Sequence, residues 1–379
     1  MPTIQADALP GAAALLRDYH AGAFFLASPT GVLLADDLGT RLTSVAAADA
    51  ALAAAGPGAT VVGAVPFDLT APARLAVAGS VRRGAPWHHV ANRPAPPAKG
   101  TWTRRDADRD VFLAGVRKAL ARLDRPGLRK VVLARALELT YSHRIEPGEL
   151  LAALADRDPY GYTFAVDLSD DMGDRTLLGA SPELLVSRRG SRVLANPLAG
   201  SAPRDQDPVR DGRNATALLS SVKDRREHDL VVAAVADGLA PLCRSVTVPE
   251  PELLPTRAMW HLSTQITGEV ADGVSAFDLA TALHPTPAVC GDPTGQARDL
   301  IGELEPFDRG FYTGLVGWSD AAGDGDWVVT IRCGEVSGAG LRLYAGAGIV
   351  PGSTPDAEFA ETAAKFRTFL SALGVEEDA

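Results

Sequence analysis

The sequence predicts an α+β fold built around a large antiparallel or mixed sheet. Apolar and β-branched runs typical of strands recur along the chain, and segments with a helical apolar period lie between them. The two kinds of segment follow one another in mixed order, without the strict strand–helix alternation of a parallel sheet. The 379 residues, 46% hydrophobic and 22% charged, are sufficient for one large domain or for two to three average ones.

The first hundred residues are rich in alanine and glycine. Apolar runs at 23–35 and 60–69 predict strands, and VAAADAALAAA at 45–55 predicts a short helix between them. RPAPPAKG, at 93–100, carries three prolines and predicts a loop or a boundary.

After this boundary the patterns are sharper. Residues 106–124 predict a helix, because apolar residues recur at helical spacing and the first turn is acidic. KVVLARALELT, at 130–140, predicts a strand that begins with a lysine. The remaining expected elements are paired strands around a glycine turn at 175–200, one long helix at 216–242, a hairpin with a glycine-rich exit at 327–350 and an amphipathic helix at 356–373.

Charge and cysteine content exclude several classes of protein. The net charge of −10 argues against a nucleic-acid or membrane-surface partner, and no apolar run is long enough to span a bilayer. Cys243, Cys290 and Cys333 are scattered and odd in number, which indicates buried thiols in a reducing cytosol and not a disulfide framework or a zinc site. We therefore expect a cytoplasmic protein.

Two predicted helices each carry a pair of carboxylates three residues apart. Asp224 and Glu227 share one helix face, and Glu358 and Glu361 share another. Two such pairs could hold one Mg²⁺, which binds a few carboxylates together with water and substrate oxygens. The same spacing also fits solvated helix faces with internal ion pairs, so that spacing alone leaves both interpretations open.

Single residues elsewhere have equally ambiguous patterns. Lys130 could be a general base if it lies in a desolvated pocket, and Glu183 in SPELL an acid if it faces a site. The glycine-containing segments 196–204 and 344–353 could bring backbone N–H groups to an anion, or could be plain turns. His261 is more typical of a hydrogen-bonded core histidine than of a ligand.

The segment LHPTPAVCG, at 283–291, combines a histidine, two prolines and a cysteine. His284 has no partner at metal-ligand spacing, and Cys290 has no activating base near it in the sequence. The prolines stiffen the backbone, so the segment is interpreted as a rigid wall.

Taken together, the motifs resemble those of the chorismate-utilising enzymes over roughly residues 105–370, and within them most closely those of isochorismate synthases, which feed siderophore, salicylate or menaquinone pathways. The segments that carry the resemblance are, in order, KVVLAR, GASPELL, PLAGSAPR, KDRREHDLV, WHLST, LHPTPAVCGDP, ELEPFDRGFYTGLVGW, WVVTIRC, LYAGAGIVPGS and EFAET. The resemblance implies two large sheets packed as a β-sandwich with peripheral helices, as in anthranilate synthase component I. Residues 1–100 match poorly and are expected to be a divergent part of the same fold, with the chorismate-binding catalytic region at 101–379.

The resemblance also implies a role for each candidate. Lys130 matches the general base that activates water, and Glu183 the general acid that protonates the departing hydroxyl. Glu227 and Glu361 match ligands of Mg²⁺, joined by Glu358 and Asp224. The residues expected to contact the substrate are Gly200, Ser201, His261, Ala288, Val289, Tyr312, Arg332, Tyr344, Gly346, Gly348 and Lys365.

Four positions bear on the branch of the family. Relatives that use ammonia lack the lysine base and normally partner a glutaminase, so Lys130 favours water as nucleophile and no glutaminase subunit. Ala199 stands where one type carries a nucleophilic lysine. Ala288 replaces a threonine of the salicylate synthases, whereas Tyr312 resembles a tyrosine of that group. We therefore predict a monomeric isochorismate synthase acting on chorismate, with a salicylate synthase, or a chorismate-binding homologue without independent activity, as alternatives.

Overall fold

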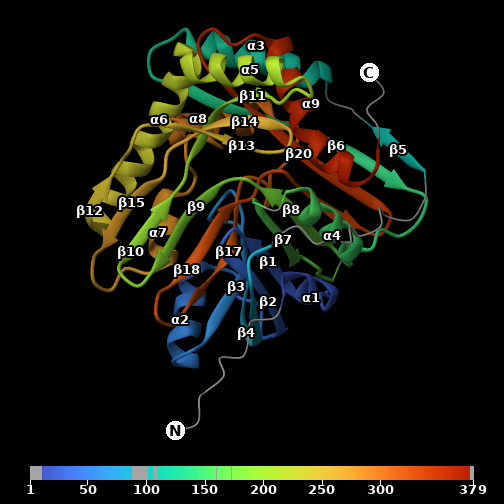
Figure 1. The fold of residues 1–379 in the computed structure, drawn as a ribbon, viewed down its shortest axis with the longest axis vertical. Helices are drawn as coiled ribbons and strands as arrows, with labels where there is room; N and C mark the ends of the chain where they lie inside the picture. The colour runs from blue at the N-terminus through green and yellow to red at the C-terminus, as the bar shows by residue number, and fades with distance from the viewer. Residues whose placement is uncertain (1–10, 88–100, 106–108, 159, 172, 376–379) are drawn as a thin grey trace.

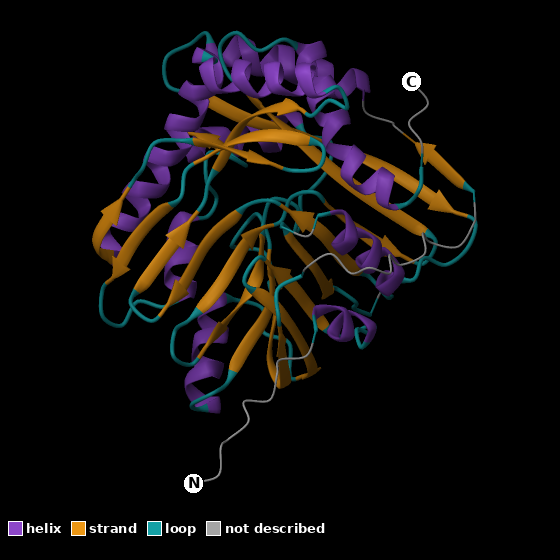
Figure 2. Cartoon of the chain, in the orientation of Figure 1, coloured by secondary structure: helices purple, strands orange, loops and turns teal. Residues whose placement is uncertain are grey.

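The computed structural model describes residues 11–87, 101–105, 109–158, 160–171 and 173–375. Two large antiparallel sheets lie face to face, and helices cover their outer sides (Figure 1, Figure 2). This confirms the predicted α+β fold with a two-sheet core. Among the helices of the described residues, none has the length and apolar character needed to cross a membrane.

The first sheet contains the strand that begins with Lys130. Neighbouring strands of this sheet are antiparallel throughout. In order, its strands are β4 (Arg74–Gly84), β2 (Gly31–Leu38), β1 (Phe24–Ser28), β7 (Tyr162–Asp167), β8 (Thr176–Ser181), β19 (Cys333–Ser337), β20 (Gly340–Ile349) and β6 (Lys130–Tyr141), with β5 (Trp102–Arg105) and the short β16 (Gly291–Asp292) beyond β6.

The second sheet shares β4 with the first. Residues 74–77 of β4 pair with β3, and residues 78–84 pair with β2, so this long strand joins the two sheets along one edge. The order continues from β3 (Thr60–Val65) through β17 (Leu315–Asp320), β18 (Gly325–Val329), β9 (Leu184–Arg189), β10 (Arg192–Ala195) and β15 (Ile266–Val270) to β12 (Cys243–Thr247). A small separate sheet contains β11 (Leu198–Pro203), β14 (Met259–Ser263) and β13 (Glu252–Pro255).

Apolar side chains from the facing sides of both sheets form the central core. Phe24 and Phe164 come from the first sheet, and Val316 and Val328 from the second, and each is at most 1% exposed. Removing such side chains from water is the main stabilising contribution to the sandwich. Separate apolar clusters bury the helices on the outer faces: α1 (Ala12–Arg17), α4 (Pro147–Arg157) and α9 (Pro355–Ala372) on the first sheet, α2 (Val45–Ala55), α6 (Val222–Leu239) and α7 (Ala276–Leu283) on the second, and α3 (Arg109–Leu123) and α8 (Thr294–Leu304) beside β6.

The prediction of a single long helix at 216–242 is wrong. The chain forms α5 (Pro208–Ser220) and α6, separated at Ser221, whose backbone is extended at φ −68° and ψ 116°. The Ser221 side chain accepts a hydrogen bond from the Asp224 N–H and so caps the second helix. A serine satisfies the free amides of a helix N-terminus well, so it can start a helix inside an apparently continuous helical pattern.

The paired strands predicted at 175–200 and the hairpin predicted at 327–350 are each divided between the sheets. β9 and β10 do pair around Gly190, but β8 belongs to the other sheet. β19 and β20 form the predicted hairpin, whereas β18 lies in the second sheet. The chain therefore changes sheet at residues 182–183 and again at 330–332.

The glycine-rich exit predicted near 344–353 is also different from expectation. Gly346 and Gly348 lie within β20 and pair with Ala134 and Val132 of β6, and the strand ends only at Ile349. The predicted proline-rich loop at 93–100 lies outside the described residues.

Candidate active site

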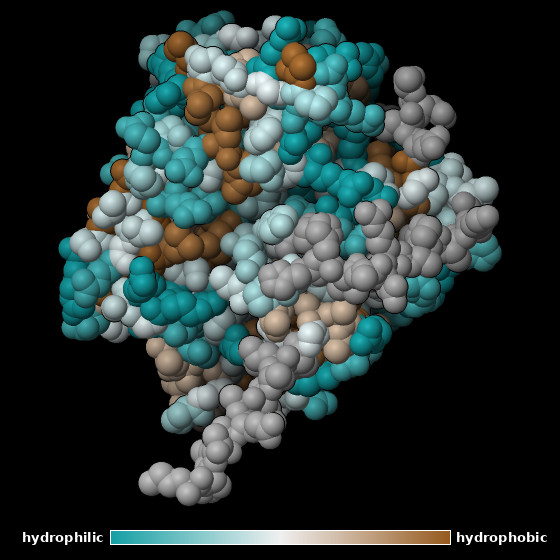
Figure 3. Space-filling model, viewed as in Figure 1, coloured by the Kyte–Doolittle hydropathy of each residue, from teal (hydrophilic) through white to brown (hydrophobic). Residues whose placement is uncertain are grey.

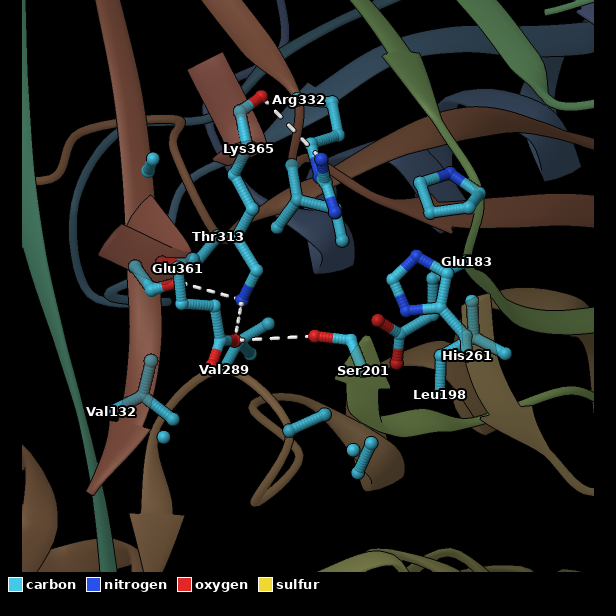
Figure 4. Close-up of a pocket in the computed structure, with 18 of the residues that line it drawn as sticks. Val132, Glu183, Leu198, Ser201, His261, Val289, Thr313, Arg332, Glu361 and Lys365 are labelled. Carbon is cyan, nitrogen blue, oxygen red and sulfur yellow. Dashed lines mark hydrogen bonds and ion pairs between the residues drawn. The ribbon is translucent and has the colours of Figure 1, made fainter. Parts of the chain in front are cut away.

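A cavity lies where the two large sheets, the small sheet and α9 meet, and most of the predicted site residues line it (Figure 4). Of those residues, the cavity is lined by Glu183, Gly200, Ser201, Glu227, His261, Ala288, Val289, Tyr312, Arg332, Tyr344, Gly346, Gly348, Glu361 and Lys365. Lys130, Asp224 and Glu358 are not among the lining residues. With Val132, which also lines the cavity, the lining residues extend to Lys365, so residues more than two hundred positions apart are brought together.

The two sheet-changing segments deliver Glu183 and Arg332 to the cavity. Glu183 follows β8 and precedes β9, and Arg332 lies between β18 and β19. The segments are tied together, because the Val329 N–H donates to the Glu183 carbonyl at 3.1 Å and the Ala180 N–H donates to the Arg332 carbonyl at 3.0 Å. Arg332 has a positive φ of 50°, a strained conformation for a non-glycine residue that often marks a functional position.

Glu183 is placed to hold a proton near neutral pH. Its side chain is 3% exposed. Burial raises the pKa of Glu183 to about 7, although a hydrogen bond from the Leu198 backbone and the charges of Lys130 and Lys365 act in the opposite direction. A carboxyl group with this pKa can donate a proton in neutral solution, as a general acid must.

His261, on β14, lies on the same side of the cavity as Glu183 (Figure 4). Burial, with the positive charges of Arg332 and Lys365, lowers its pKa well below the ordinary value, so the imidazole is neutral. Among the described residues, its Nε2 has no hydrogen-bond partner. A neutral imidazole nitrogen without a protein partner is available to a bound substrate.

Lys130 begins β6 and is only 1% exposed. Its Nζ lies 2.8 Å from Glu227 Oε1, and this carboxylate separates it from the cavity. The pair depends on Gly348, because a Cβ there would lie 2.3 Å from Glu227 Oε1 and 3.0 Å from Lys130 Cε. Close approach, and not a free N–H group in a turn, is therefore the structural reason for glycine at this position.

Glu361 and Lys365, one turn apart on α9, lie opposite Glu183 (Figure 4). Lys365 Nζ lies 2.7 Å from Glu361 Oε1 and donates to the Gly346 carbonyl at 2.8 Å. The Ser201 hydroxyl donates to the same Glu361 oxygen at 3.4 Å. Arg332 donates to the Lys365 carbonyl at 3.4 Å, and burial lowers its pKa to about 10, so it still carries its charge at neutral pH.

Gly200 and Ser201 form a bulged strand instead of the predicted turn. The register of β11 against β14 shifts between Leu198 and Ser201, and Gly200 has a φ of 79°. A Cβ at Gly200 would approach the Asp224 Cβ to 3.1 Å. The bulge therefore turns Ser201 toward α9 while β11 packs closely on α6.

The four predicted magnesium ligands lie close enough to affect one another. Burial raises the pKa of Asp224, and Glu227 and Glu361 raise it further; burial and Glu361 likewise raise the pKa of Glu358. Within the described ranges, however, no three His, Cys, Asp or Glu side chains are arranged to hold a metal ion. Lysines pair with three of the carboxylates instead: Lys130 with Glu227, Lys223 with Glu358 at 3.3 Å and Lys365 with Glu361. Three of the four carboxylates thus have a lysine ammonium as their cation here, and carboxylate oxygens are the donors that hard divalent cations prefer.

The LHPTPAVCG segment forms one wall of the cavity through Ala288 and Val289. His284 Nε2 bonds to the Phe67 carbonyl at 3.0 Å, and Cys290 is fully buried. Burial raises the pKa of the Cys290 thiol to about 11. His284 is thus held by a backbone hydrogen bond and Cys290 is a buried, protonated thiol, so neither is placed to act as a metal ligand or a nucleophile.

The sequence interpretation missed several apolar and small residues of the lining. They are Val132, Pro182, Leu198, Thr313, Ile331 and Ala345. Most are neighbours of predicted residues, and adjacency to a motif is the only sequence signal that could have found them. The rings of Tyr312 and Tyr344 stack at 5.0 Å with an interplanar angle of 13°.

This architecture is that of an enzyme with one cavity between its sheets. The buried Glu183 carboxyl lies on one side of the cavity, and Glu361 and Lys365 lie on the other. A family model described as "Chorismate binding enzyme" matches residues 76–374, and the chain belongs to this family. Isochorismate synthase DhbC from Bacillus subtilis is 50% identical over 96% of both chains. Isochorismate synthase EntC from Escherichia coli K12 is 40% identical over 83% of this chain and 81% of its own.

Solved structures agree with this assignment. DhbC from Bacillus anthracis superposes with a TM-score of 0.90 at 45% identity, covering 96% of this chain and 100% of that chain. MenF, the menaquinone-specific isochorismate synthase from Escherichia coli, has a TM-score of 0.85 at 25% identity and covers 98% and 93%, respectively. Anthranilate synthase component I from Streptococcus pneumoniae shares the fold, with a TM-score of 0.69 at 21% identity over 93% of this chain and 90% of that chain.

Proposed function

We propose that this protein is an isochorismate synthase, an isomerase that converts chorismate to isochorismate. The observation that carries the proposal is the buried Glu183 carboxyl, with a pKa of about 7, facing a cavity whose opposite side carries Lys365 and Glu361. The names of the relatives support the same activity and do not favour the salicylate-forming alternative.

The reaction moves a hydroxyl group between two ring carbons. Water bonds to C2 of chorismate and gives up a proton to the neutral amine of Lys130. In this step Lys130 is released from its ion pair with Glu227 and has lost its own proton, so that its nitrogen can accept one. The bond between C4 and its hydroxyl breaks, and Glu183 supplies the proton that lets it leave as water. One water enters and one leaves, so substrate and product are isomers. His261, beside Glu183, holds the departing hydroxyl.

Chorismate carries two carboxylates, and the cavity offers a different kind of partner for each. Arg332 presents a buried guanidinium suited to a bidentate carboxylate contact in the cavity that Tyr344, Gly346 and Gly348 also line. Mg²⁺ held by Glu227 and Glu361, with Glu358 and Asp224, would neutralise the ring carboxylate. Ser201 and Lys365 complete the anion contacts.

Product identity tests the proposal directly. Protein incubated with chorismate and Mg²⁺ should form isochorismate, identified by chromatography, and isochorismate supplied alone should yield chorismate. Salicylate fluorescence with pyruvate release would instead identify a salicylate synthase. Unchanged chorismate would indicate a binding homologue without independent activity.

Glu361→Gln should raise the Mg²⁺ concentration required for half-maximal activity by about tenfold or more. The substitution keeps the shape of the side chain but removes one negative charge from the proposed ligand set, and hard cations prefer carboxylate oxygens. A Mg²⁺ titration of initial rates measures the effect, with the exposed Glu303→Gln as control. A titration curve identical to that of the parent protein would contradict the ligand assignment.

Ala288→Thr should reduce isochorismate formation by about tenfold, because the added groups occupy space proposed for the attacking water, and small misplacements in a site have large effects on rate. Ala288→Val has a similar volume without the hydroxyl and separates bulk from hydrogen bonding. Initial rates of product formation measure both variants. Undiminished isochorismate formation by the threonine variant would refute the interpretation of this wall.

The remaining features of the proposal concern the setting of the enzyme. We propose a cytoplasmic monomer that requires no glutaminase subunit and serves siderophore, menaquinone or salicylate biosynthesis. The division into a divergent part at 1–100 and a catalytic region at 101–379 stays a prediction, although β1–β4 hydrogen-bond into both sheets.

A further inference from the structure

A buried ion pair lies directly behind the cavity without contributing to its lining. The side chains of Arg309 and Glu305 are each 2% exposed. Arg309 Nε donates to Glu305 Oε2 at 2.8 Å and Nη2 donates to Oε1 at 2.5 Å, so the guanidinium and the carboxylate meet along two parallel bonds. Such a pair does not by itself indicate stabilisation, because removing both charges from water is costly.

The remaining donors of Arg309 bind three residues that line the cavity. Nη1 donates to the Val289 carbonyl at 2.7 Å and to the Thr313 hydroxyl at 3.2 Å. Nη2 donates to the Val132 carbonyl at 2.8 Å. One side chain therefore joins the strand that carries Lys130, the wall formed by residues 288–289, and the segment before β17.

The Arg309–Glu305 pair lies beside β6, at the point where the neighbouring strand β16 ends. β16 pairs with β6 only through Gly291 and Asp292, and the Val132 N–H then donates to the Cys290 carbonyl. The Val132 carbonyl faces the same edge of β6, since both polar groups of a residue in an antiparallel ladder point to one side.

Two residues further along β6, Ala134 faces this edge again, and its N–H donates to Glu305 Oε1 at 2.8 Å. Arg309 and Glu305 thus supply the acceptor and the donors that a longer β16 would have supplied. Because these bonds come from side chains, they leave the backbone at 286–290 free to curve into the cavity wall.

We propose that Arg309 and Glu305 are positioning residues that hold the strand bearing Lys130 at a set distance from the Ala288–Val289 wall, and so define the space in which water is aligned for attack. This inference rests on the proposed function for its catalytic consequence. Arginine is required because a planar guanidinium can reach a carboxylate and two carbonyls together, whereas a lysine ammonium is a point donor.

Arg309→Lys tests this role, since it retains the charge but loses the fork. We expect kcat for isochorismate formation to fall by about 10- to 100-fold, because a shift of about 1 Å in a site has effects of this size. KM for chorismate should stay within about threefold of the parent value, because Arg332, Lys365 and Ser201 lie on other elements and are expected to provide substrate affinity.

Glu305→Gln is the second variant, because it preserves shape and can still accept the Ala134 N–H. It should lower kcat in the same direction by a smaller factor. Arg188→Lys is the matched control: Arg188 is largely buried and donates to the Ala322 carbonyl and to Asp324, and it does not line the cavity. Its kcat should equal that of the parent.

Amide hydrogen exchange provides a measurement independent of the reaction. In both test variants, exchange should accelerate in peptides covering 130–136 and 286–290, and should remain unchanged in peptides of β18. Unaltered exchange there, or a folded Glu305→Gln protein with the parent kcat, would overturn the proposal. Equal losses in Arg188→Lys and Arg309→Lys would also overturn it. If the parent protein forms no isochorismate, the proposed function fails, and exchange alone decides whether the pair holds the wall.

Discussion

Replacing Lys130 with alanine should lower kcat for isochorismate formation by about 10²- to 10⁴-fold, the usual contribution of a general base. The structure gives this lysine a specific place: it is buried, begins β6, and contacts Glu227 at the edge of the cavity. Substrate affinity should change less, because the cations proposed to bind the carboxylates of chorismate, Arg332 and Lys365, are untouched. Steady-state rates with isochorismate quantified as product provide the measurement.

Removing the lysine also leaves the Glu227 carboxylate without its cation, so the folded state of the variant must be checked by circular dichroism and thermal unfolding. Lys118→Ala, on the exposed face of α3, is the control and should retain the parent kcat. A folded Lys130→Ala protein with unchanged turnover would remove the lysine from the mechanism and strengthen the case for a different catalytic base.

Glu183→Gln should cause a loss of similar size, about 10²- to 10⁴-fold in kcat, because glutamine keeps the hydrogen-bonding shape but cannot deliver a proton. The parent enzyme should also lose activity as pH rises through about 7. The acid acts in its protonated form, and burial raises the pKa of Glu183 to about 7, so this form is abundant below that pH and disappears above it. A pH profile of kcat measures the effect.

In the Gln variant the residual activity should lack this decline at higher pH. Glu149→Gln, at an exposed position of α4, is the control for both rate and profile. A parent profile that stays flat from pH 6 to pH 8.5, or a Gln variant with the parent rate, would show that the leaving hydroxyl receives its proton elsewhere.

Local sequence patterns predicted the elements that depend on local physics. The helix at 45–55 has the bounds that its alanine-rich run predicts, and the strand at 130–140 extends by only one residue in the structure. The amphipathic helix at 356–373 is displaced by one residue at each end. In these segments, propensity, apolar period and tertiary burial all favour the same conformation.

Patterns failed where distant segments decided the outcome. The break at Ser221 arises from a cap that competes with an otherwise helical run, and β20 continues through its glycines because β6 pairs with every residue along it. Residues 182–183 and 330–332 lie outside strands because the strand before each segment and the strand after it belong to different sheets. A period of two or of 3.6 residues contains no information on which sheet receives a strand.

By itself, the sequence determined the kinds of residue available for chemistry and, through the order of its motifs, the family to which they belong. Only the tertiary structure decided their states and partners. Glu183 holds its proton near neutral pH because burial removes water from a carboxylate, and Lys130 meets Glu227 because Gly348 leaves room for both. Arg309 reaches the Val132 carbonyl because the short β16 leaves that edge of β6 unpaired, and it binds Val289 and Thr313 with its other terminal nitrogen. Desolvation and close packing are properties of the folded arrangement, which brings together residues more than two hundred positions apart, so they cannot be inferred from the spacing of residues along the chain.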